Sequence, residues 1–570
     1  MSSNALGNPW HLMSARDVVE ALKQGKVTPL ELIDVVEARL EETDGLLHTT
    51  PITCFERARK AAQNLKHPKS PKPGYLYGLP ILIKDDNAVS GVRYTEGSPL
   101  HRDRIPAFSS QIVTRLEEMG GIVVGKTNTP EFMAGSHSFN TLFETTRSPY
   151  DIRTSAGGSS GGSAAALGGA QIWLATGSDL GGSLRIPAAF CGVVGFRCTP
   201  GRIPRERPVP GATYESKQAY YLHGVSGPMA RGVQDLALFL DAMTSENAIN
   251  GEAEAGWEEF AVPPALPYLS EVDCRGHWQT IAQRSLVQPR NLRIGFSTLG
   301  LRFSDDVVSM CRNAAIVLAN AMGTNSQSNL SIDSDFPSLT TASKLIEIES
   351  PFDLSAAERC FYTIRSEKFH KGFTGFYTTE EMSTMKPELQ WNINCHLIAD
   401  NPDMIMKKAI KEAENLFKSV NEDLFTDKVD ILVTPATLDV SFDQKYRYPT
   451  KKFGEQSEDD TFKNYLEWMM PSCLISATSS PALVLPAGKL KDGRPVGVQL
   501  VGKWGSDATV LEAAAVLESK LQLSMHHGLS SPICGSSKLN ASGPISEDEA
   551  AKHHKEAIDL YRDKYVKVLE

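Results

Sequence analysis

The sequence predicts an α/β fold. Along its 570 residues, amphipathic helical patterns alternate with short apolar runs of strand length, which is typical of helices packed around a sheet. An apolar fraction of 41% and a charged fraction of 22% supply a large core and exclude wholesale disorder. The net charge of −10 gives the chain as a whole no electrostatic attraction to nucleic acid.

The N-terminal part of the chain contains three helical patterns and two strand patterns. Apolar residues three or four positions apart predict helices over 15–22 and 30–40. The apolar run 77–84 predicts a buried strand that ends in a lysine. A helix over 109–119 then leads into a strand over 121–125.

The C-terminal half repeats this alternation with longer helices. Short apolar runs predict strands over 292–296 and 429–433. Between these two runs, apolar spacing predicts helices over 305–321 and 404–417.

Three segments break the alternation. Weak periodicity and many polar residues predict surface insertions at 245–290 and 323–345, and the variable region extends to about residue 425. Residues 528–545 are expected to form a loose linker. A capping-box pattern that begins at Ser546 predicts a charged helix after it, so that 528–570 forms a linker and a C-terminal helix.

No part of the chain resembles an export signal or a membrane span. The sequence has no uninterrupted apolar run of about 18 residues, the length that a spanning helix needs, and no basic N-terminus followed by an apolar stretch. The nine cysteines are an odd number without a CxxC pair, which favours reduced thiols. We therefore expect a cytoplasmic protein.

Two short motifs fit catalytic patterns by letter but not by context. Residues 120–127 match the phosphate-binding pattern GxxxxGK[ST], yet a predicted strand occupies the variable positions and Pro130 follows in place of a helix. Residues 158–162 match G-x-S-x-G, which would make Ser160 the nucleophile of an α/β hydrolase. The preceding residues form a poor strand and no histidine stands out as a partner, so we reject both interpretations.

A Gly/Ser/Ala-rich block over 154–198 carries the strongest chemical signal. Large apolar residues are threaded through it, so it is not a flexible linker. Glycines lack a Cβ atom, which lets the backbone approach a substrate closely. The run from Leu180 to Ser183 places successive N–H groups beside a hydroxyl, which suits an oxyanion hole for acyl transfer. Composition alone equally allows a loop that binds an anion or only turns the chain.

This block resembles the signature of the amidase signature family of serine hydrolases. The resemblance covers most of residues 14–240 and 425–520. Its motifs lie at 78–85, 125–128, 157–163, 177–187, 190–195, 479–483 and 493–502. The family implies a single large α/β domain, here 1–527 with its insertions, in which helices surround a mixed, twisted central sheet.

The resemblance also implies a Ser–cisSer–Lys triad. Ser183 matches the nucleophile, Ser159 the bridging serine after a cis peptide bond, and Lys84 the base. A charged lysine cannot accept a proton, but Lys84 follows an apolar strand, and burial lowers the pKa of an ammonium group. A decrease from about 10.4 to about 7–8 would correspond to roughly 4 kcal/mol of differential interaction.

Other residues are assigned to the substrate site on the same grounds. Met133, followed by Ala134 and Gly135, is placed on the wall of the acyl pocket. Backbone N–H groups are expected to stabilise the oxyanion at Leu180, Gly181, Gly182 and Ser183.

Three residues are expected to support the triad. Asp179 and Arg185 should form an ion pair that braces the nucleophile loop, and Ser160 should add a hydrogen bond to Lys84.

The function implied is hydrolysis of a small, non-peptide carboxamide to a carboxylate and ammonia or an amine through an acyl-serine. No cofactor, metal or nucleic acid is required, and a homodimer is a candidate assembly that the sequence does not specify. Two alternatives stay open: a glutaminase subunit of a tRNA-dependent amidotransferase, and an acyl-transferring or amide-forming enzyme of secondary metabolism. A membrane-bound fatty-acid amide hydrolase is less consistent with the missing N-terminal span.

Overall fold

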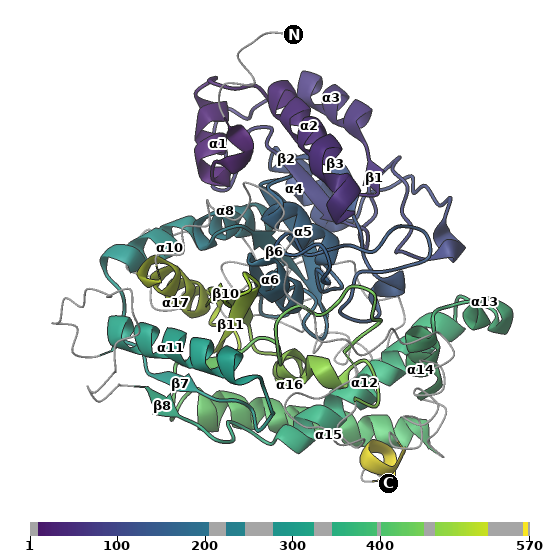
Figure 1. The fold of residues 1–570 in the computed structure, drawn as a ribbon, viewed down its shortest axis with the longest axis vertical. Coiled ribbons are helices and arrows are strands. Elements are labelled where there is room, and N and C mark those ends of the chain that lie inside the picture. The colour runs from purple at the N-terminus through teal and green to yellow at the C-terminus, as the bar shows by residue number, and fades with distance from the viewer. Residues whose placement is uncertain are drawn as a thin grey trace.

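The computed structural model describes residues 9–203, 224–244, 278–323, 345–395, 401–449, 462–521 and 562–567. Eleven strands within these residues form one sheet, seen at the centre of Figure 1. Their bounds are β1 (Ile52–Thr53), β2 (Pro80–Lys84), β3 (Ile122–Thr127), β4 (Leu174–Asp179), β5 (Val194–Arg197), β6 (Val225–Ala230), β7 (Ile294–Phe296), β8 (Ile346–Glu347), β9 (Ile431–Pro435), β10 (Ala482–Lys489) and β11 (Pro495–Gly502).

The sheet is mixed, as the family resemblance implies. The strand order is β1-β3-β2-β4-β6-β5-β10-β11-β9-β7-β8. Strands β3, β2 and β4 are parallel to one another, and so are β9, β7 and β8. Antiparallel pairings through β6, β5, β10 and β11 join the two parallel groups. The parallel strands β2, β3 and β4 are buried along their whole length, as expected for strands covered on both faces.

Helices surround this sheet. Their bounds are α1 (Ala15–Lys23), α2 (Pro29–Leu47), α3 (Phe55–Asn64), α4 (Gln111–Glu118), α5 (Gly161–Gly168), α6 (Arg185–Cys191), α8 (Val233–Met243), α10 (Trp278–Val287), α11 (Asp305–Met322), α12 (Leu354–Thr374), α13 (Thr379–Ser383), α14 (Pro387–Cys395), α15 (Pro402–Ser419), α16 (Met470–Ala477) and α17 (Asp507–Lys520). In Figure 1, α1 to α3 lie at one end of the molecule and α12 to α15 at the other.

Two glycines of β11 show how closely helices approach the sheet. A Cβ atom on Gly497 would lie 2.4 Å from the Cβ atom of Ala189 in α6, and one on Gly502 would lie 2.5 Å from Val510 in α17. Side chains alternate between the faces of a strand, so these two positions point to opposite faces. Helices α6 and α17 therefore cover opposite faces of the sheet, and a side chain at either glycine would displace them.

The predicted elements are present with small shifts at their ends. The helices expected over 15–22, 30–40, 109–119, 305–321 and 404–417 are α1, α2, α4, α11 and α15. The four expected strands are β2, β3, β7 and β9, and β3 extends two residues beyond its expected end, to Thr127.

The expectation of a surface insertion over 245–290 is wrong for its last part. Trp278, the first residue of α10, is 1% exposed, and the helix packs against α8 and α17. The reason is that α10 fills a groove beside the sheet with its few apolar residues, too few to give a clear periodicity. The first part of this segment, 245–277, and residues 324–344 lie outside the described residues.

The region up to residue 425 also contributes to the core. Helix α12 carries a long buried face and packs against α14, α15 and α16. The expected linker lies outside the described residues, and so does most of the expected C-terminal helix. Of that helix, one turn over Arg562–Val566 is described, in which Tyr565 stacks on Tyr362 of α12 with ring centroids 4.5 Å apart.

Candidate active site

The predicted triad lies at the edge of the sheet where β2, β3 and β4 end. Because these strands are parallel, their carboxyl ends meet at one edge, the usual position for sites in α/β sheets. Lys84 is the last residue of β2, and β4 ends at Asp179, immediately before the loop 180–184 that leads into α6. Helix α5 begins at this edge with Gly161, directly after Ser159 and Ser160.

Small residues allow α5 to lie against the strand ends. A Cβ atom on Gly162 would lie 2.4 Å from the backbone nitrogen of Asn128, which follows β3. Further into the helix, the hydroxyl of Ser163 donates to the carbonyl of Thr176 in β4 at 2.8 Å. These contacts fix the start of α5, and with it the serines that precede the helix, against β3 and β4.

Lys84 and Ser159 are in direct contact. The Lys84 side chain has no exposed surface, and its Nζ lies 2.7 Å from the Oγ atom of Ser159. The peptide bond between Gly158 and Ser159 is cis, as the resemblance implies. A Cβ atom on Gly158 would lie 2.9 Å from the backbone nitrogen of His137, so the backbone reaches this position only without a side chain.

Ser183 lies on the neighbouring loop. It is 7% exposed, and its carbonyl oxygen accepts a hydrogen bond of 3.2 Å from the backbone N–H of Ser160. The structure therefore brings the segments that carry Lys84, Ser159 and Ser183 together. Gly182 precedes Ser183 with φ +113°, and a Cβ atom there would lie 2.5 Å from the side chain of Ser472. Only glycine fits this position, because both the φ value and the space exclude a side chain.

One of the four expected oxyanion donors is already engaged. The N–H of Gly182 donates to Oδ1 of Asp179 at 2.8 Å, so it does not point to a substrate, and this part of the expectation is wrong. The N–H groups of Leu180, Gly181 and Ser183 have no acceptor among the residues that the structure describes. The loop therefore offers three N–H groups for an oxyanion, and the fourth holds the loop in shape.

Asp179 fixes the loop from below. Arg185 donates to both of its carboxylate oxygens at 2.9 Å, and the N–H of Leu184 donates to Oδ2 at 3.1 Å. Arg197 adds a hydrogen bond of 2.7 Å to the Asp179 carbonyl. Burial alone would raise the pKa of the Asp179 carboxyl, but the two guanidinium groups and the hydrogen bonds outweigh it and hold this pKa well below its usual range. The expected ion pair is present and fully buried.

Ser160 differs from its expected role. Its hydroxyl exchanges hydrogen bonds of 3.3 Å with the backbone carbonyl and N–H of Ser178, and not with Lys84. The hydroxyl of Ser178 contacts the lysine instead, with its Oγ atom 2.9 Å from Nζ of Lys84. The reason is that Ser160 starts α5 and faces the β4 backbone, whereas the end of β4 lies directly beside β2.

Two neighbours of Lys84 did not emerge from the sequence. Ser178 lies within the signature motif, but no spacing rule distinguishes it from the serines around it. Asp86 follows Lys84 by two residues, and its Oδ2 atom lies 3.8 Å from Nζ of Lys84 with 7% of the Asp86 side chain exposed. A carboxyl group so close in sequence to a predicted base was the available signal.

The segment around Met133 has an unusual backbone. Phe132 and Met133 have φ values of +47° and +56°, and Met133 is half-buried at the end of a short 3-10 turn. Ala134 belongs to a small apolar cluster with residues of α12 and α14. A Cβ atom on Gly135 would lie 3.5 Å from the ring of Tyr465. The contact of Met133 with substrate stays a prediction.

The rejected motifs also have clear positions. Lys126 and Thr127 are the last two residues of β3 and no helix starts there, so 120–127 is not a phosphate-binding loop. Ser160 is fully buried and follows a loop instead of a strand, which does not match a nucleophile elbow.

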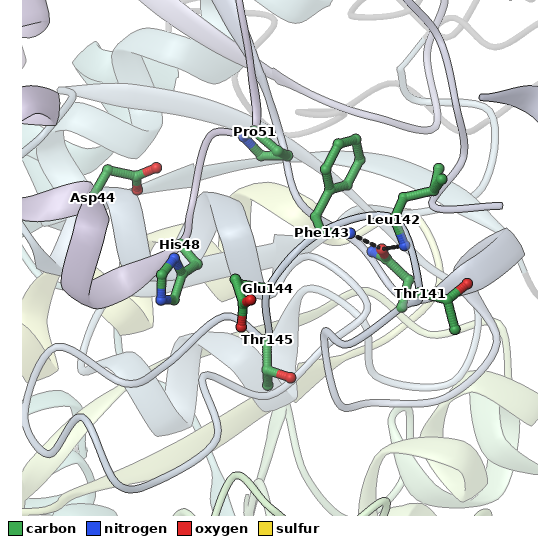
Figure 2. A pocket seen from close by; sticks show the side chains of 9 residues that line it. Asp44, His48, Pro51, Thr141, Leu142, Phe143, Glu144 and Thr145 are labelled. Carbon is green, nitrogen blue, oxygen red and sulfur yellow. Dashed lines mark hydrogen bonds between the residues drawn. The ribbon is translucent and has the colours of Figure 1, made fainter. Parts of the chain in front are cut away.

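A surface pocket of about 580 Å³ lies between the end of α2 and the loop that follows Phe139 (Figure 2). It is lined by Asp44, His48, Pro51, Asn140, Thr141, Leu142, Phe143, Glu144 and Thr145. Figure 2 shows the Asn140 side chain accepting hydrogen bonds from the N–H groups of Leu142 and Phe143, which closes the loop on itself. None of the predicted site residues lines this pocket.

Two searches of the described residues gave no site or span. No group of three or more His, Cys, Asp or Glu side chains is arranged there to hold a metal ion. No helix in this part of the chain is both long enough and apolar enough to cross a membrane.

Comparisons with curated proteins place the chain beside components of amidotransferases. It is 28% identical to one component of the Glutamyl-tRNA(Gln) amidotransferase of Natranaerobius thermophilus over 528 residues, which cover 90% of this chain and 96% of the relative. The corresponding protein of Carboxydothermus hydrogenoformans is 27% identical over 522 residues, which cover 90% of this chain and 98% of the relative.

Solved structures share the fold. A bacterial aryl acylamidase of the amidase signature family superposes with a TM-score of 0.73 at 22% identity, over 91% of this chain and 98% of that one. A 6-aminohexanoate cyclic dimer hydrolase gives a TM-score of 0.70 at 22% identity, over 90% and 97%.

The family model for amidases matches residues 31–511, which include all three predicted triad residues. This match spans most of the sequence, and the mixed sheet agrees with the solved family structure. The chain therefore belongs to the amidase signature family.

Proposed function

We propose that this chain is an amidase that hydrolyses a linear, non-peptide carboxamide to a carboxylate and ammonia or an amine, through an ester on Ser183. The observation that carries the proposal is the buried contact of 2.7 Å between Nζ of Lys84 and Oγ of Ser159, next to the loop that bears Ser183. Two serines and a lysine in this order provide a nucleophile, a proton relay and a base.

The proposed reaction begins with proton transfer. Neutral Lys84 accepts a proton from the hydroxyl of Ser159, which takes one from Ser183 as the Ser183 Oγ atom attacks the amide carbon. A C–O bond forms, and the carbonyl oxygen becomes an oxyanion that the free N–H groups of the loop stabilise. When the C–N bond breaks, the same relay returns the proton to the leaving nitrogen.

Hydrolysis of the ester completes the cycle. Water gives a proton to Ser159 and Lys84 as its oxygen attacks the acyl carbon, and the bond to Ser183 breaks with return of the proton to Oγ. The relay needs Lys84 neutral at the start of each half-reaction. Burial of the lysine among hydroxyl groups favours this form.

The glutaminase alternative has one observation in its favour, the similarity to amidotransferase components over 90% of the chain. That role needs partner subunits, whereas our proposal is a free-standing cytoplasmic enzyme, as a monomer or homodimer, that binds no nucleic acid. Purification of the protein at its native level, followed by mass spectrometry, separates the two. An acyl-transferring enzyme would form a new amide when an amine is added, and product analysis detects it.

A fluorophosphonate probe tests the proposal directly. The wild-type protein should be labelled at Ser183, and Ser183→Ala should lose both labelling and release of ammonia or amine from a panel of aliphatic, aryl and fatty amides. Labelling at Ser160, or full turnover by Ser183→Ala, would refute it.

A further inference from the structure

Arg365 is a buried arginine near the candidate site that pairs with no carboxylate among the described residues. Its side chain is 5% exposed. Its Nε atom donates to Oδ1 of Asn392 at 3.0 Å, and Nη2 donates to the hydroxyl of Tyr465 at 2.7 Å. Both acceptors are neutral, and Nη1 has no acceptor among the residues described. A buried guanidinium without a counter-ion is rare, because burial of an unpaired charge is costly.

The position of Arg365 links it to the nucleophile loop. Phe361 lies one turn earlier on α12, on the same helix face, and its ring would lie 2.8 Å from a Cβ atom on Gly181. The rise of one turn places Arg365 about 6 Å further along the helix axis. Helix α12 packs against α16, and there Cys473 also contacts the loop, with its Sγ atom 3.5 Å from the Gly181 carbonyl.

The second link runs to the predicted acyl pocket. Tyr465, which accepts the hydrogen bond from Arg365, has its ring 3.5 Å from a Cβ position on Gly135. The guanidinium group therefore lies between two elements of the site, the oxyanion loop and the segment that begins at Met133.

The other charges nearby do not compensate Arg365. Glu388 forms two hydrogen bonds with Arg447, at 2.6 and 2.7 Å, and Glu131 accepts from the backbone N–H of Lys386 at 2.9 Å. The Lys386 ammonium donates to the Ala134 carbonyl, and burial lowers its pKa to about 8. Cations therefore outnumber carboxylates in this part of the wall.

We infer that Arg365 binds a carboxylate on the acyl group of the substrate, so that the preferred substrates are monoamides of dicarboxylic acids. An arginine is suited to this role because its planar fork matches a carboxylate. The inference rests on the proposed function, since it names the substrate of the same site. It also gives the neutral partners of Arg365 a purpose, because Asn392 and Tyr465 orient the guanidinium without neutralising it.

Kinetics on a matched pair of substrates tests this inference. Glutaryl 4-nitroanilide carries the carboxylate, and pentanoyl 4-nitroanilide is its uncharged analogue. The wild type should prefer the glutaryl substrate by at least about tenfold in kcat/KM, the factor that a charged hydrogen bond supplies. Arg365→Gln should remove the preference, mainly through KM, and leave turnover of the pentanoyl substrate unchanged. Equal rates on both substrates in the wild type, or equal loss on both in Arg365→Gln, would overturn the inference.

Arg359→Gln provides a matched control on the same helix. Arg359 pairs with Glu412 in the structure, so its loss should leave the substrate preference intact. Should Arg365→Gln fail to fold, protection of the wild type decides. Glutarate should protect Ser183 from the fluorophosphonate probe at a concentration about tenfold lower than pentanoate does, and equal protection would overturn the inference. Absence of any labelling at Ser183 would instead overturn the proposed function.

Discussion

Lys84 and Lys126 are buried lysines on neighbouring parallel strands, and their surroundings differ. Neither side chain has exposed surface. Lys126 forms an ion pair with Asp85, and its Nζ lies 4.2 Å from the ring centroid of Tyr94. Nζ of Lys84 lies within 3 Å of two serine hydroxyls, and the Asp86 carboxylate is further away, at 3.8 Å. One lysine is held by a charge, and the other faces groups that can pass a proton.

The strand register explains how two lysines so close together remain separate. Lys126 is the register partner of Ile83, and Thr127 is the partner of Lys84. Side chains alternate along a strand, so Lys84 and Lys126 point to opposite faces of the sheet. Burial, the largest influence, raises the pKa of Asp85 and lowers that of Lys126, while each partner opposes the shift of the other. The comparison teaches that a buried lysine needs proton-accepting neighbours, and not only burial, to serve as a base.

Replacement of Lys84 is expected to have the largest effect on catalysis. Lys84→Met removes the base and should lower kcat/KM on an anilide by about 10²- to 10⁴-fold, the range for general acid–base catalysis. An activated ester needs no protonation of its leaving group, so it should lose much less. Steady-state kinetics on a matched amide and ester checks this. Near wild-type rates on both substrates would show that Lys84 is a structural lysine like Lys126.

Lys126→Met should have the converse effect, a loss of stability without loss of chemistry. The substitution leaves Asp85 buried and unpaired, which typically costs about 3–5 kcal/mol. Urea unfolding measures the loss, and kcat/KM per probe-labelled active site should stay within about threefold of the wild type, since Lys126 faces away from Lys84. The double variant Lys126→Met/Asp85→Asn should recover part of the stability. A stable Lys126→Met protein with a strongly reduced rate would break the comparison.

The sequence predicted the fold class and the three triad positions, because these depend on local patterns and on a long signature. Lys84 and Lys126 both lie at the end of an apolar run, so burial alone could not separate them. The register of β2 and β3 decides which lysine faces the serines, and register is a tertiary property. Capture of the Gly182 N–H by Asp179 depends on the path of the loop. Arg365 belongs to no motif, and only the packing of α12 brings it near the site.

Ser178→Ala is expected to have an intermediate effect. Its hydroxyl contacts Nζ of Lys84 at 2.9 Å, so its loss should misplace the lysine without removing the relay. A hydrogen bond to a charged group contributes about 1.5–3 kcal/mol, which corresponds to roughly 10- to 100-fold in kcat/KM. Ser160→Ala is the control, because its hydroxyl bonds only to backbone atoms of Ser178 and its effect should be smaller. A larger loss in Ser160→Ala than in Ser178→Ala would reverse the assignment.

Asp86→Asn should have the smallest effect on the maximal rate and a distinct effect on its pH dependence. The carboxylate lies 3.8 Å from Nζ of Lys84 and favours the charged ammonium, so it raises the pH needed to free the base. With asparagine in its place, more of the lysine is neutral at a given pH. The acidic limb of kcat/KM against pH should then move to lower pH by about one unit.

Asp86→Glu retains the charge and should keep the wild-type profile, which separates electrostatics from packing. A profile of Asp86→Asn that superposes on the wild type would show that Asp86 does not act on Lys84. A shift to higher pH would mean that the titrating group is an acid and not the lysine. A shift to lower pH that leaves the plateau within about threefold would assign the limb to Lys84, since loss of a carboxylate lowers the pKa of a neighbouring base without removing it.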